Sequence, residues 1–320
     1  MTANKNITAL LPVKNGSRYI QNSLSQIQLS CSPSDEILVI DDFSEDNTKS
    51  IVRKIMKTDS RIRLVHNQTP GFVNALNLGL KESLNIWVAR FDVDDNYEIN
   101  RIEEQRKSID SSVTGIFTDY DFFNEQLKYL GMMPSAIDSN SVSLSLVSST
   151  RTAHPSVLFN KEAVMSVGSY REEDFPAEDL SLWLRMSRTG QLISIPKTLL
   201  HYRLSRNSIS GTKRLEATKK KNEHLQTIGI NPENSDFCLK NLETILENYK
   251  KFSHFNEREL LFIHDLLLYS KLNPQTNYRK ILKLKNVINY SSKNLIRIQK
   301  IRSIIDLYNE KIARKNERKG

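Results

Sequence analysis

Residues 86–97, IWVARFDVDDNY, hold an apolar run that ends in three acids within four positions. Apolar runs of this kind, rich in branched and aromatic residues, are typical of buried strands. Because side chains alternate along a strand, Asp92 and Asp94 are expected to point to one side at its carboxyl end. Two carboxylates directed at one point repel each other unless a cation lies between them. Open α/β sheets bind ligands at the edge where their strands end, so this stretch predicts a divalent metal ion that holds a phosphorylated substrate.

Strand and helix signals alternate on the amino-terminal side of this stretch. Short runs that are apolar on both faces, separated by segments with helix-spaced apolar residues, indicate a sheet that is covered on both sides. The order predicts an α/β fold with a mostly parallel central sheet, right-handed crossovers and flanking helices. The expected strands are 7–13, 36–42, 62–67 and the run that ends at Asp92, and the expected helices are 17–29, 46–56 and 72–84.

The pattern changes after about residue 113. Polar, helical signals follow residue 210, so we expect one domain over residues 1–211 and a helical, basic region over residues 212–320. Further strands are expected at 113–123, 154–159, 191–195 and 199–203, and further helices at 178–188, 242–249, 257–269 and 295–308.

The composition is typical of a soluble protein, with 38% hydrophobic residues and a mean hydropathy of −0.47. No uninterrupted apolar stretch is long enough to span a bilayer. The first residues lack the charged, apolar and small-residue segments of a secretion signal. Cys31 and Cys238 lie far apart in the sequence and suggest no disulfide framework. These features predict a cytoplasmic protein.

The positive charge is concentrated at the carboxyl end. Residues 271–320 carry 14 Lys and Arg against 3 Asp and Glu, whereas the preceding residues are close to neutral. An apolar stripe from Leu295 to Tyr308 is flanked by basic side chains. It fits a helix that packs on the first domain, a helix that attaches to an anionic membrane surface, or a nucleic-acid-binding tail. Nucleic acid ranks last because the tail has few aromatic residues and no recognised nucleic-acid module.

Other interpretations compete for the acids after residue 91. An EF-hand loop would have the spacing of Asp92, Asp94, Asn96 and Glu103, but Tyr97 stands where that loop requires glycine. A solvated acidic turn is the plainest alternative. Mg²⁺ and Mn²⁺ prefer oxygen ligands and usually take one or two carboxylates together with substrate phosphates, which favours a metal site for a nucleotide-linked substrate.

Two further acid pairs lie at the ends of predicted elements. Asp41 and Asp42 end the second expected strand, where a carboxylate could accept hydrogen bonds from a ribose hydroxyl or a base N–H, or cap the next helix. Glu178 and Asp179 open an expected helix, where acids also suit the positive end of the helix dipole. An ionised carboxylate there could instead accept the proton of an attacking hydroxyl.

Six motifs occur in one order along the chain: LLPVKNGSRYI, ILVIDDFSEDNT, GFVNALNLGL, VARFDVDDNYEINRIEEQ, HPSVLFNKEAV and EDLSLWLRM. Together they resemble the family 2 inverting glycosyltransferases, which have the nucleotide-sugar-binding GT-A fold. The resemblance covers about residues 5–211, and the subgroup that the chain resembles is the bacterial one that builds surface polysaccharides. It implies that residues 1–211 are a GT-A catalytic domain.

The resemblance implies roles for a set of donor-site residues. Pro12 and its neighbours would line the nucleobase, and Asp42 would contact the uridine. Asp92 and Asp94 match the Asp-x-Asp pair that holds the donor and its Mn²⁺ or Mg²⁺, with Asp94 as the direct metal ligand. Arg203 resembles a residue in a loop that closes over the diphosphate.

The resemblance also implies that Asp179 is the catalytic base, with Glu178 beside it. Two positions depart from the family pattern. Lys14 stands where the family most often has Tyr, which weakens the case for a base contact there. Ser205 stands where many members have His, and Arg206, which follows at once, would meet the diphosphate instead.

The implied activity is metal-dependent, inverting transfer of a sugar from a UDP-sugar to a hydroxyl of a glycan on a polyprenyl diphosphate carrier, in O-antigen, capsule or related surface polysaccharide synthesis. A peripheral position on the inner face of the cell membrane would suit such an acceptor. Two alternatives stay open. A catalytically weak member would bind nucleotide sugar or scaffold an assembly complex, and a nucleotidyltransferase would need a glycine-rich phosphate loop, for which residues 12–16 are a poor match.

Overall fold

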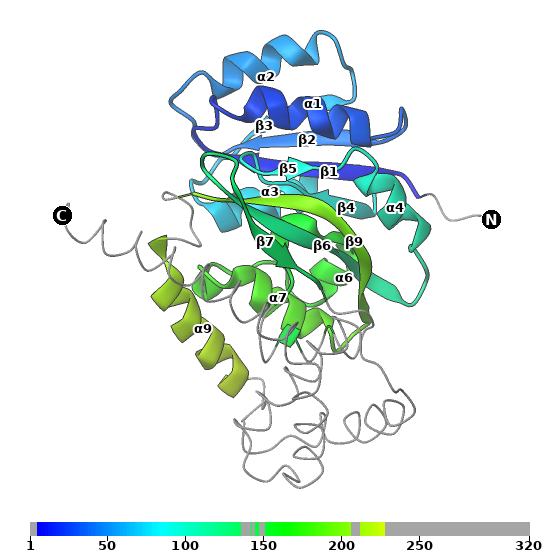
Figure 1. Cartoon of the computed structure of the whole chain (residues 1–320), viewed down its shortest axis with the longest axis vertical. Coiled ribbons are helices and arrows are strands. Elements are labelled where there is room, and N and C mark those ends of the chain that lie inside the picture. The colour runs from blue at the N-terminus through cyan, green and yellow to red at the C-terminus, as the bar shows by residue number, and fades with distance from the viewer. Residues whose placement is uncertain (1–4, 136–141, 143–144, 147–150, 206–211, 228–320) are drawn as a thin grey trace, which may run out of the picture.

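The structure, a computed structural model, describes residues 5–135, 142, 145–146, 151–205 and 212–227. Strands and helices alternate in its first part, and the later part contains the two longest of the described strands, Val113–Asn124 and Gln191–Leu204 (Figure 1). The first elements are β1 (Ile7–Val13), α1 (Ile20–Ser30), β2 (Glu36–Asp41), α2 (Thr48–Met56), β3 (Ile62–His66), α3 (Phe72–Glu82) and β4 (Trp87–Arg90). The later elements are β5 (Asn96–Tyr97), α4 (Arg101–Lys107), β6 (Val113–Asn124), β7 (Tyr129–Met133), β8 (Leu158–Asn160), α6 (Lys161–Ser166), α7 (Glu178–Met186), β9 (Gln191–Leu204) and α9 (Arg214–Thr227).

Strands β1 to β4 form the parallel part of a sheet with the order β3-β2-β1-β4-β8-β6-β9-β5, in which β7 also pairs with β6. β1 lies between β2 and β4, so that Val13 pairs with Asp41 and Leu10 pairs with Arg90. This register places the carboxyl ends of β1, β2 and β4 at one edge of the sheet. The predicted α/β fold with a mostly parallel sheet is therefore confirmed.

The second part of the sheet mixes strand directions. β6 and β9 run parallel, whereas β8 pairs antiparallel with both β4 and β6. β5 follows the acids of the opening stretch and pairs antiparallel with the far part of β9, where Asn96 faces His201 and Tyr97 faces Leu200. This pairing carries Arg203 towards the residues that follow β4.

The strand expected at 154–159 was wrong over its first half. Residues His154–Ser156 form a 3₁₀ turn, and only Leu158–Asn160 pairs in the sheet as β8. Pro155 explains the difference, because proline fixes φ and has no N–H to donate to a strand ladder.

The two strands expected at 191–195 and 199–203 are one strand, β9. Its pairing with β6 is irregular between Ile195 and Thr198, on either side of Pro196. A residue without an N–H interrupts a ladder and is tolerated at such a bulge. The sequence therefore showed the interruption of the ladder and not the continuity of the strand. Elements β5, α4, β7 and α6 were not predicted.

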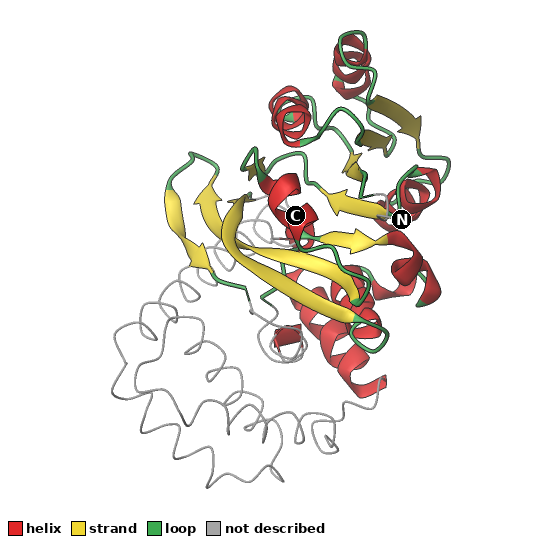
Figure 2. Ribbon diagram, turned by 90° about the vertical axis from the view of Figure 1, so that its right-hand side faces the viewer, coloured by secondary structure: helices red, strands yellow, loops and turns green. Residues whose placement is uncertain are grey.

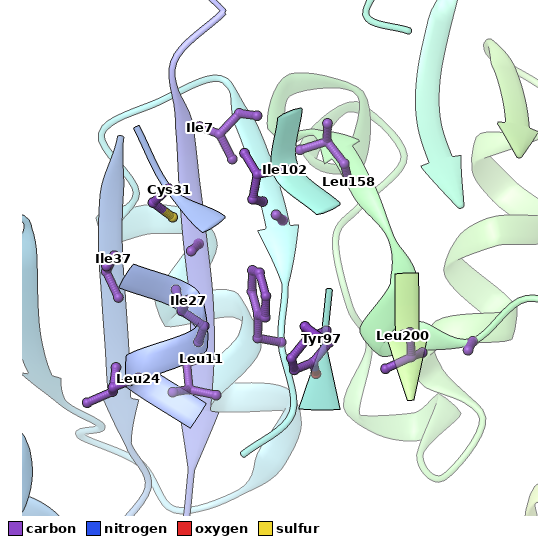
Figure 3. Packing of buried hydrophobic residues seen from close by; sticks show 14 of the residues in the cluster. Ile7, Leu11, Leu24, Ile27, Cys31, Ile37, Tyr97, Ile102, Leu158 and Leu200 are labelled. Carbon is purple, nitrogen blue, oxygen red and sulfur yellow. The ribbon is translucent and has the colours of Figure 1, made fainter. Parts of the chain in front are cut away.

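Figure 2 shows the central sheet together with its helices. Two apolar cores lie on the two faces of this sheet. Alternate residues enter opposite cores: Leu10 and Leu38 pack with residues of α3 and α7, whereas Leu11 and Val39 pack with residues of α1, α2 and α4. Figure 3 shows part of the second core, which includes the ring of Tyr97. Coverage of both faces explains why these strands are apolar on both sides.

Helix α9 belongs to the region that was expected to be helical and basic. The helices expected at 242–249, 257–269 and 295–308 lie outside the described residues. Among the helices that the structure does describe, none combines the length and the apolar character that crossing a membrane requires.

Candidate active site

The acids after β4 lie on a turn and not on the strand itself, because β4 ends at Arg90. The Tyr97 hydroxyl closes this turn: it accepts a hydrogen bond from the Asp92 N–H at 2.6 Å and donates one to the Asp92 carbonyl oxygen at 3.2 Å. The Asp92 carboxylate forms an ion pair with the Arg90 guanidinium. Burial, and then the charge of Asp92, raise the pKa of Asp94 to about 6. Asp92 and Asp94 are therefore close together, as predicted, although a turn and not the alternation of side chains along a strand brings them there.

Arg203 of β9 holds the same turn from another side. Its main-chain N–H donates to Oδ1 of Asp95 at 2.8 Å, and its Nε–H donates to the Asp94 carbonyl oxygen at 2.7 Å. Its guanidinium carbon also lies 5.3 Å from the ring centroid of Tyr19, just before α1. The side chain thus links the acidic turn to the loop after β1. Arg206 lies outside the described residues.

Arg90 is a buried cation among these acids. Its side chain is 2% exposed, and its guanidinium carbon lies 5.4 Å from the centroid of the Phe72 ring. Burial by itself would lower the pKa of Arg90, but the charge of Asp92 and further contributions raise it, so the guanidinium stays protonated. Burial raises the pKa of four nearby carboxyls, and the positive charge of Arg90 opposes that rise in each: Asp94, Asp95, Glu178 and Asp179.

A second pair of acids opens helix α7. Glu178 is buried, and Oδ1 of Asp179 accepts a hydrogen bond from the Leu180 N–H at 2.6 Å. The buried face of the helix includes Trp183, whose ring meets the Phe117 ring of β6 edge-on at 5.3 Å between centroids. Trp183 is therefore a core residue, and its packing fixes the orientation of the helix.

The acids of α7 interact electrostatically with residues of β4 and of the turn that follows it. The charges of Arg90 and Asp92 both shift the pKa of Asp179, which places its carboxyl within electrostatic reach of the turn after β4. Asp92 also raises the pKa of Glu178. Arg90 and Asp92 therefore act on the carboxyls of both Asp94 and Asp179, and Arg203 contacts the same turn.

Burial raises the pKa of Asp94 and Asp95 on the turn and of Glu178 and Asp179 on α7. Burial and the charge of Asp179 raise the pKa of Glu178 to about 8, and burial also raises the pKa of Asp179. The pKa of Asp95 lies well above its ordinary value because of burial and the charges of Asp94 and Asp92. A cation bound beside these carboxyls would favour their charged forms.

The donor atoms of the turn suit a divalent cation. Carboxylate oxygens are the ligands that Mg²⁺ and Mn²⁺ prefer, and Oδ2 of Asp95 is buried with no hydrogen-bond partner among the described residues. In the described part of the chain, no three His, Cys, Asp or Glu side chains are arranged to hold a metal ion by themselves. A cation held by one or two carboxylates needs no such trio, because substrate phosphates complete its coordination.

The predicted nucleobase contacts lie at the ends of β1 and β2. Pro12 is buried within β1, and Lys14 is exposed on the loop that follows. Asp42 follows β2, and its Oδ1 accepts hydrogen bonds from Nδ2 of Asn67 at 2.8 Å and from the Gly71 N–H at 3.0 Å. Asp42 therefore fixes the start of α3. The alternative in which it caps the next helix, α2, was wrong, because its side chain contacts the start of α3 instead.

A buried histidine lies beneath the site. Nε2 of His154 is 2.8 Å from the Tyr170 hydroxyl, and its ring lies 5.8 Å from the Trp183 ring, between centroids. Burial, and then the charge of Arg90, hold the pKa of His154 well below its ordinary value, so the ring is neutral. These contacts make His154 a packing residue under the two acid groups.

Sequence reasoning missed Arg90 and Tyr97. A signal for Arg90 was available, because a charge inside a buried apolar run requires a partner, and Asp92 stands two positions later. Tyr97 had no such signal, since its hydrogen bonds depend on a turn that hydrophobic periodicity does not describe.

Residues 8–142 match the sequence model of a protein family described as "Glycosyl transferase family 2". The chain contains a family 2 glycosyltransferase domain. The matched segment includes Asp42 and the acids after β4, and it ends before α7. The resemblance that the ordered motifs carry is therefore confirmed.

Two relatives that share the family 2 domain differ in how much of their length this chain matches. A glycosyltransferase of Rickettsia felis is 28% identical over 206 residues, which are 62% of this chain and 33% of that protein. The Escherichia coli protein WfgD is named a UDP-Glc:alpha-D-GlcNAc-diphosphoundecaprenol beta-1,3-glucosyltransferase. It is 26% identical over 219 residues, which are 65% of this chain and 80% of WfgD. The chain thus spans about a third of the first relative and most of the second.

Solved structures share the GT-A fold of this family 2 domain. TarS of S. aureus, residues 1–349 in complex with UDP-GlcNAc, has a TM-score of 0.59 at 15% identity, over 98% of this chain and 92% of that one. The mannosyltransferase PcManGT of Pyrobaculum calidifontis, in complex with GDP-Man and Mn²⁺, has a TM-score of 0.58 at 16% identity, over 97% and 86%. At these identities the likeness shows the fold alone.

Proposed function

We propose that this chain is a metal-dependent inverting glycosyltransferase that moves a sugar from a UDP-sugar to a hydroxyl group of a glycan acceptor. One observation carries the proposal: Asp92 pairs with the buried Arg90, and the charges of both act on Asp179 at the start of helix α7. One acid group suits a cation and a diphosphate, and the other suits proton transfer. The family 2 domain supports the reaction type.

The turn after β4 is the proposed donor site. Asp94, with Asp92 beside it, would hold Mn²⁺ or Mg²⁺, and Asp94 would be the direct ligand. A cation bound there would offset the negative charge that develops on the departing diphosphate. Arg203 adds a positive charge next to the turn. Pro12 and Asp42 lie at the strand ends, where open α/β sheets receive nucleotides.

Asp179 is the proposed catalytic base. As an acceptor hydroxyl attacks C1 of the donor sugar, its proton passes to the Asp179 carboxylate and the bond between C1 and the diphosphate breaks. A single displacement of this kind inverts the anomeric configuration, so an α-linked donor gives a β-linked product. Burial raises the pKa of Asp179 and strengthens it as a proton acceptor, while the charge of Arg90 opposes its protonation before substrate binds.

The proposed acceptor is a glycan on a polyprenyl diphosphate carrier, in O-antigen, capsule or related surface polysaccharide synthesis. WfgD supports this class, because its name specifies a diphosphoundecaprenol-linked sugar.

In this proposal residues 1–211 are the catalytic domain, and the basic region 212–320 holds the protein on the inner, cytoplasmic face of the cell membrane. Sedimentation of the full chain with anionic vesicles, but not with neutral ones, is expected at low salt. A chain that sediments with neither kind of vesicle would contradict the membrane contact.

A donor screen tests the function. The full chain is incubated with Mn²⁺ and a panel of UDP- and GDP-sugars, with and without polyprenyl-diphosphate-linked glycans, and release of nucleoside diphosphate is measured. We expect release from one or a few UDP-sugars that depends on the acceptor. Calorimetric binding of UDP-sugar without turnover on any acceptor would instead support a catalytically weak or scaffolding member. Absence of nucleotide binding would reject both.

A further inference from the structure

We infer that Tyr97 is a positioning residue, which holds the main chain of Asp92 so that the Asp92 carboxylate is presented to the donor diphosphate and its cation. The inference rests on the proposed function. The hydroxyl both accepts from the Asp92 N–H at 2.6 Å and donates to the Asp92 carbonyl oxygen at 3.2 Å. One side-chain oxygen therefore satisfies both main-chain polar groups of the residue that opens the acidic turn.

The Tyr97 ring is itself held by a buried cation. The Arg101 guanidinium carbon lies 5.0 Å from the centroid of the Tyr97 ring and 4.3 Å from that of Phe91, and the two rings meet edge-on at 4.6 Å. Nη2 of Arg101 donates to the carbonyl oxygens of Arg90 at 2.9 Å and Val157 at 3.2 Å. The main chain is thus fixed on both sides of Phe91, by Arg101 before it and by Tyr97 after it.

Two distant segments set the position of Tyr97. Its main-chain N–H donates to Oε1 of Gln26 on α1 at 2.9 Å, and it pairs with Leu200 on β9. Figure 3 shows its ring within the core on the α1 side of the sheet. Because α1 and β9 anchor the ring, the hydroxyl is presented to Asp92 from a rigid part of the fold, as a precise ligand site requires.

Packing alone does not account for this arrangement. A phenylalanine would fill the same space and retain the contacts of the ring with Arg101 and Phe91. The hydroxyl adds only the two hydrogen bonds to Asp92, whose carboxylate pairs with Arg90. Without the hydroxyl, the partly buried N–H of Asp92 must find another partner, and the carboxylate moves with the main chain.

The test uses the full-length chain with Tyr97→Phe and, as a matched control, Tyr120→Phe. Tyr120 is another buried tyrosine of the same core, 6% exposed, on β6. Titration calorimetry measures the affinity of each protein for UDP in Mn²⁺, well below the unfolding temperature. Amide hydrogen exchange without ligand measures the protection of the Asp92 N–H. We expect Tyr97→Phe to weaken UDP binding about 5- to 30-fold and to speed exchange of the Asp92 amide, while Tyr120→Phe changes UDP affinity less than about twofold.

Each other outcome overturns the inference in a recognisable way. Faster exchange at Asp92 with unchanged UDP affinity means that the contact is structural only. Weaker UDP binding with unchanged exchange means that the effect does not pass through Asp92. Equal losses of affinity in both tyrosine variants indicate a general effect of removing a buried hydroxyl. A wild-type chain that binds no nucleoside diphosphate rejects the proposed function, and the role of Tyr97 with it.

Discussion

The acids on the turn after β4 and the acids that open α7 share the charge of one arginine, but they are held differently. On the turn, the Asp92 carboxylate is paired with Arg90, and the Asp95 carboxylate accepts the Arg203 N–H. The turn is also closed by Tyr97 through the main chain of Asp92. These acids therefore occupy positions fixed from several elements of the fold.

The acids of α7 have fewer partners. Oδ1 of Asp179 accepts an N–H from its own helix, that of Leu180, and Oε2 of Glu178 has no hydrogen-bond partner within the described residues. Hydrogen bonds and cations favour the charged form of a carboxyl, whereas burial without them favours the neutral form. Burial raises the pKa of Asp94 and Asp95 on the turn as well, so the groups differ in their contacts and not in the direction of these shifts. We propose that the turn binds the cation and the diphosphate, and that the helix exchanges a proton.

Replacing the proposed base gives the largest expected effect. Asp179→Asn keeps the size of the side chain and removes its ability to take a proton, so sugar transfer should fall by about 10²- to 10⁴-fold. The affinity for UDP in Mn²⁺ should stay within about twofold, since the contacts of the turn are untouched. Turnover is followed by UDP release and affinity by calorimetry. Transfer at the wild-type rate would show that Asp179 is not the base. It would also contradict the proposed difference in role between the two acid groups.

Loss of the cation should affect the other acid group. Asp94→Asn, or wild-type protein in EDTA, should lose donor affinity by about 100-fold, because a bound cation contributes several kcal/mol to holding a diphosphate. Added Mn²⁺ or Mg²⁺ should restore the EDTA-treated wild type and not the variant. Asp59→Asn, on the α2–β3 connection, is the matched control. Full donor binding in EDTA would exclude the metal from the proposed reaction.

The amino-terminal half of the fold could be predicted because local pattern and tertiary structure agree there. Leu10 and Leu11 are both apolar and enter opposite cores, as the strand pattern indicates. The later half was predicted less well, since its elements depend on single residues that break a pattern. Pro155 replaces half a strand by a turn, and Pro196 interrupts the pairing of β9 without ending it.

The candidate site shows the same division. Asp92, Asp94 and Asp179 follow from chain order, sheet edges and the family motifs. Arg90 and Tyr97 act through contacts that only the folded chain reveals, because an ion pair depends on burial and a hydroxyl contact depends on the path of a turn. Periodicity reports which face of an element is buried, and it carries no information about such contacts.

A pH titration of stability sharpens the contrast at α7. The pKa of Glu178 is about 8 in the folded chain, against an ordinary value of 4.5, chiefly because of burial. Between these values the folded chain keeps a proton that the unfolded chain has released, so the free energy of unfolding falls as the pH rises through this window. Glu178→Gln removes the effect. At pH 8 to 9 the variant should exceed the wild type by about 1–3 kcal/mol, and below pH 4.5 by much less. Parallel denaturation curves of the two proteins at all pH values would contradict this assignment.

The smallest expected effect lies at the edge of the turn. Arg203→Lys retains the positive charge and the main-chain N–H that donates to Asp95, but it loses the Nε–H that donates to the Asp94 carbonyl oxygen. One such hydrogen bond contributes about 1 kcal/mol, so the affinity for UDP in Mn²⁺ should fall about fivefold. The maximal rate of transfer should change little, because the base on α7 is untouched. Arg53→Lys, an exposed exchange on α2, is the matched control. A variant with unaltered affinity for UDP and slower transfer would place Arg203 with the reacting groups and not with the donor-binding turn. The contacts of the turn could then no longer be assigned to donor binding alone.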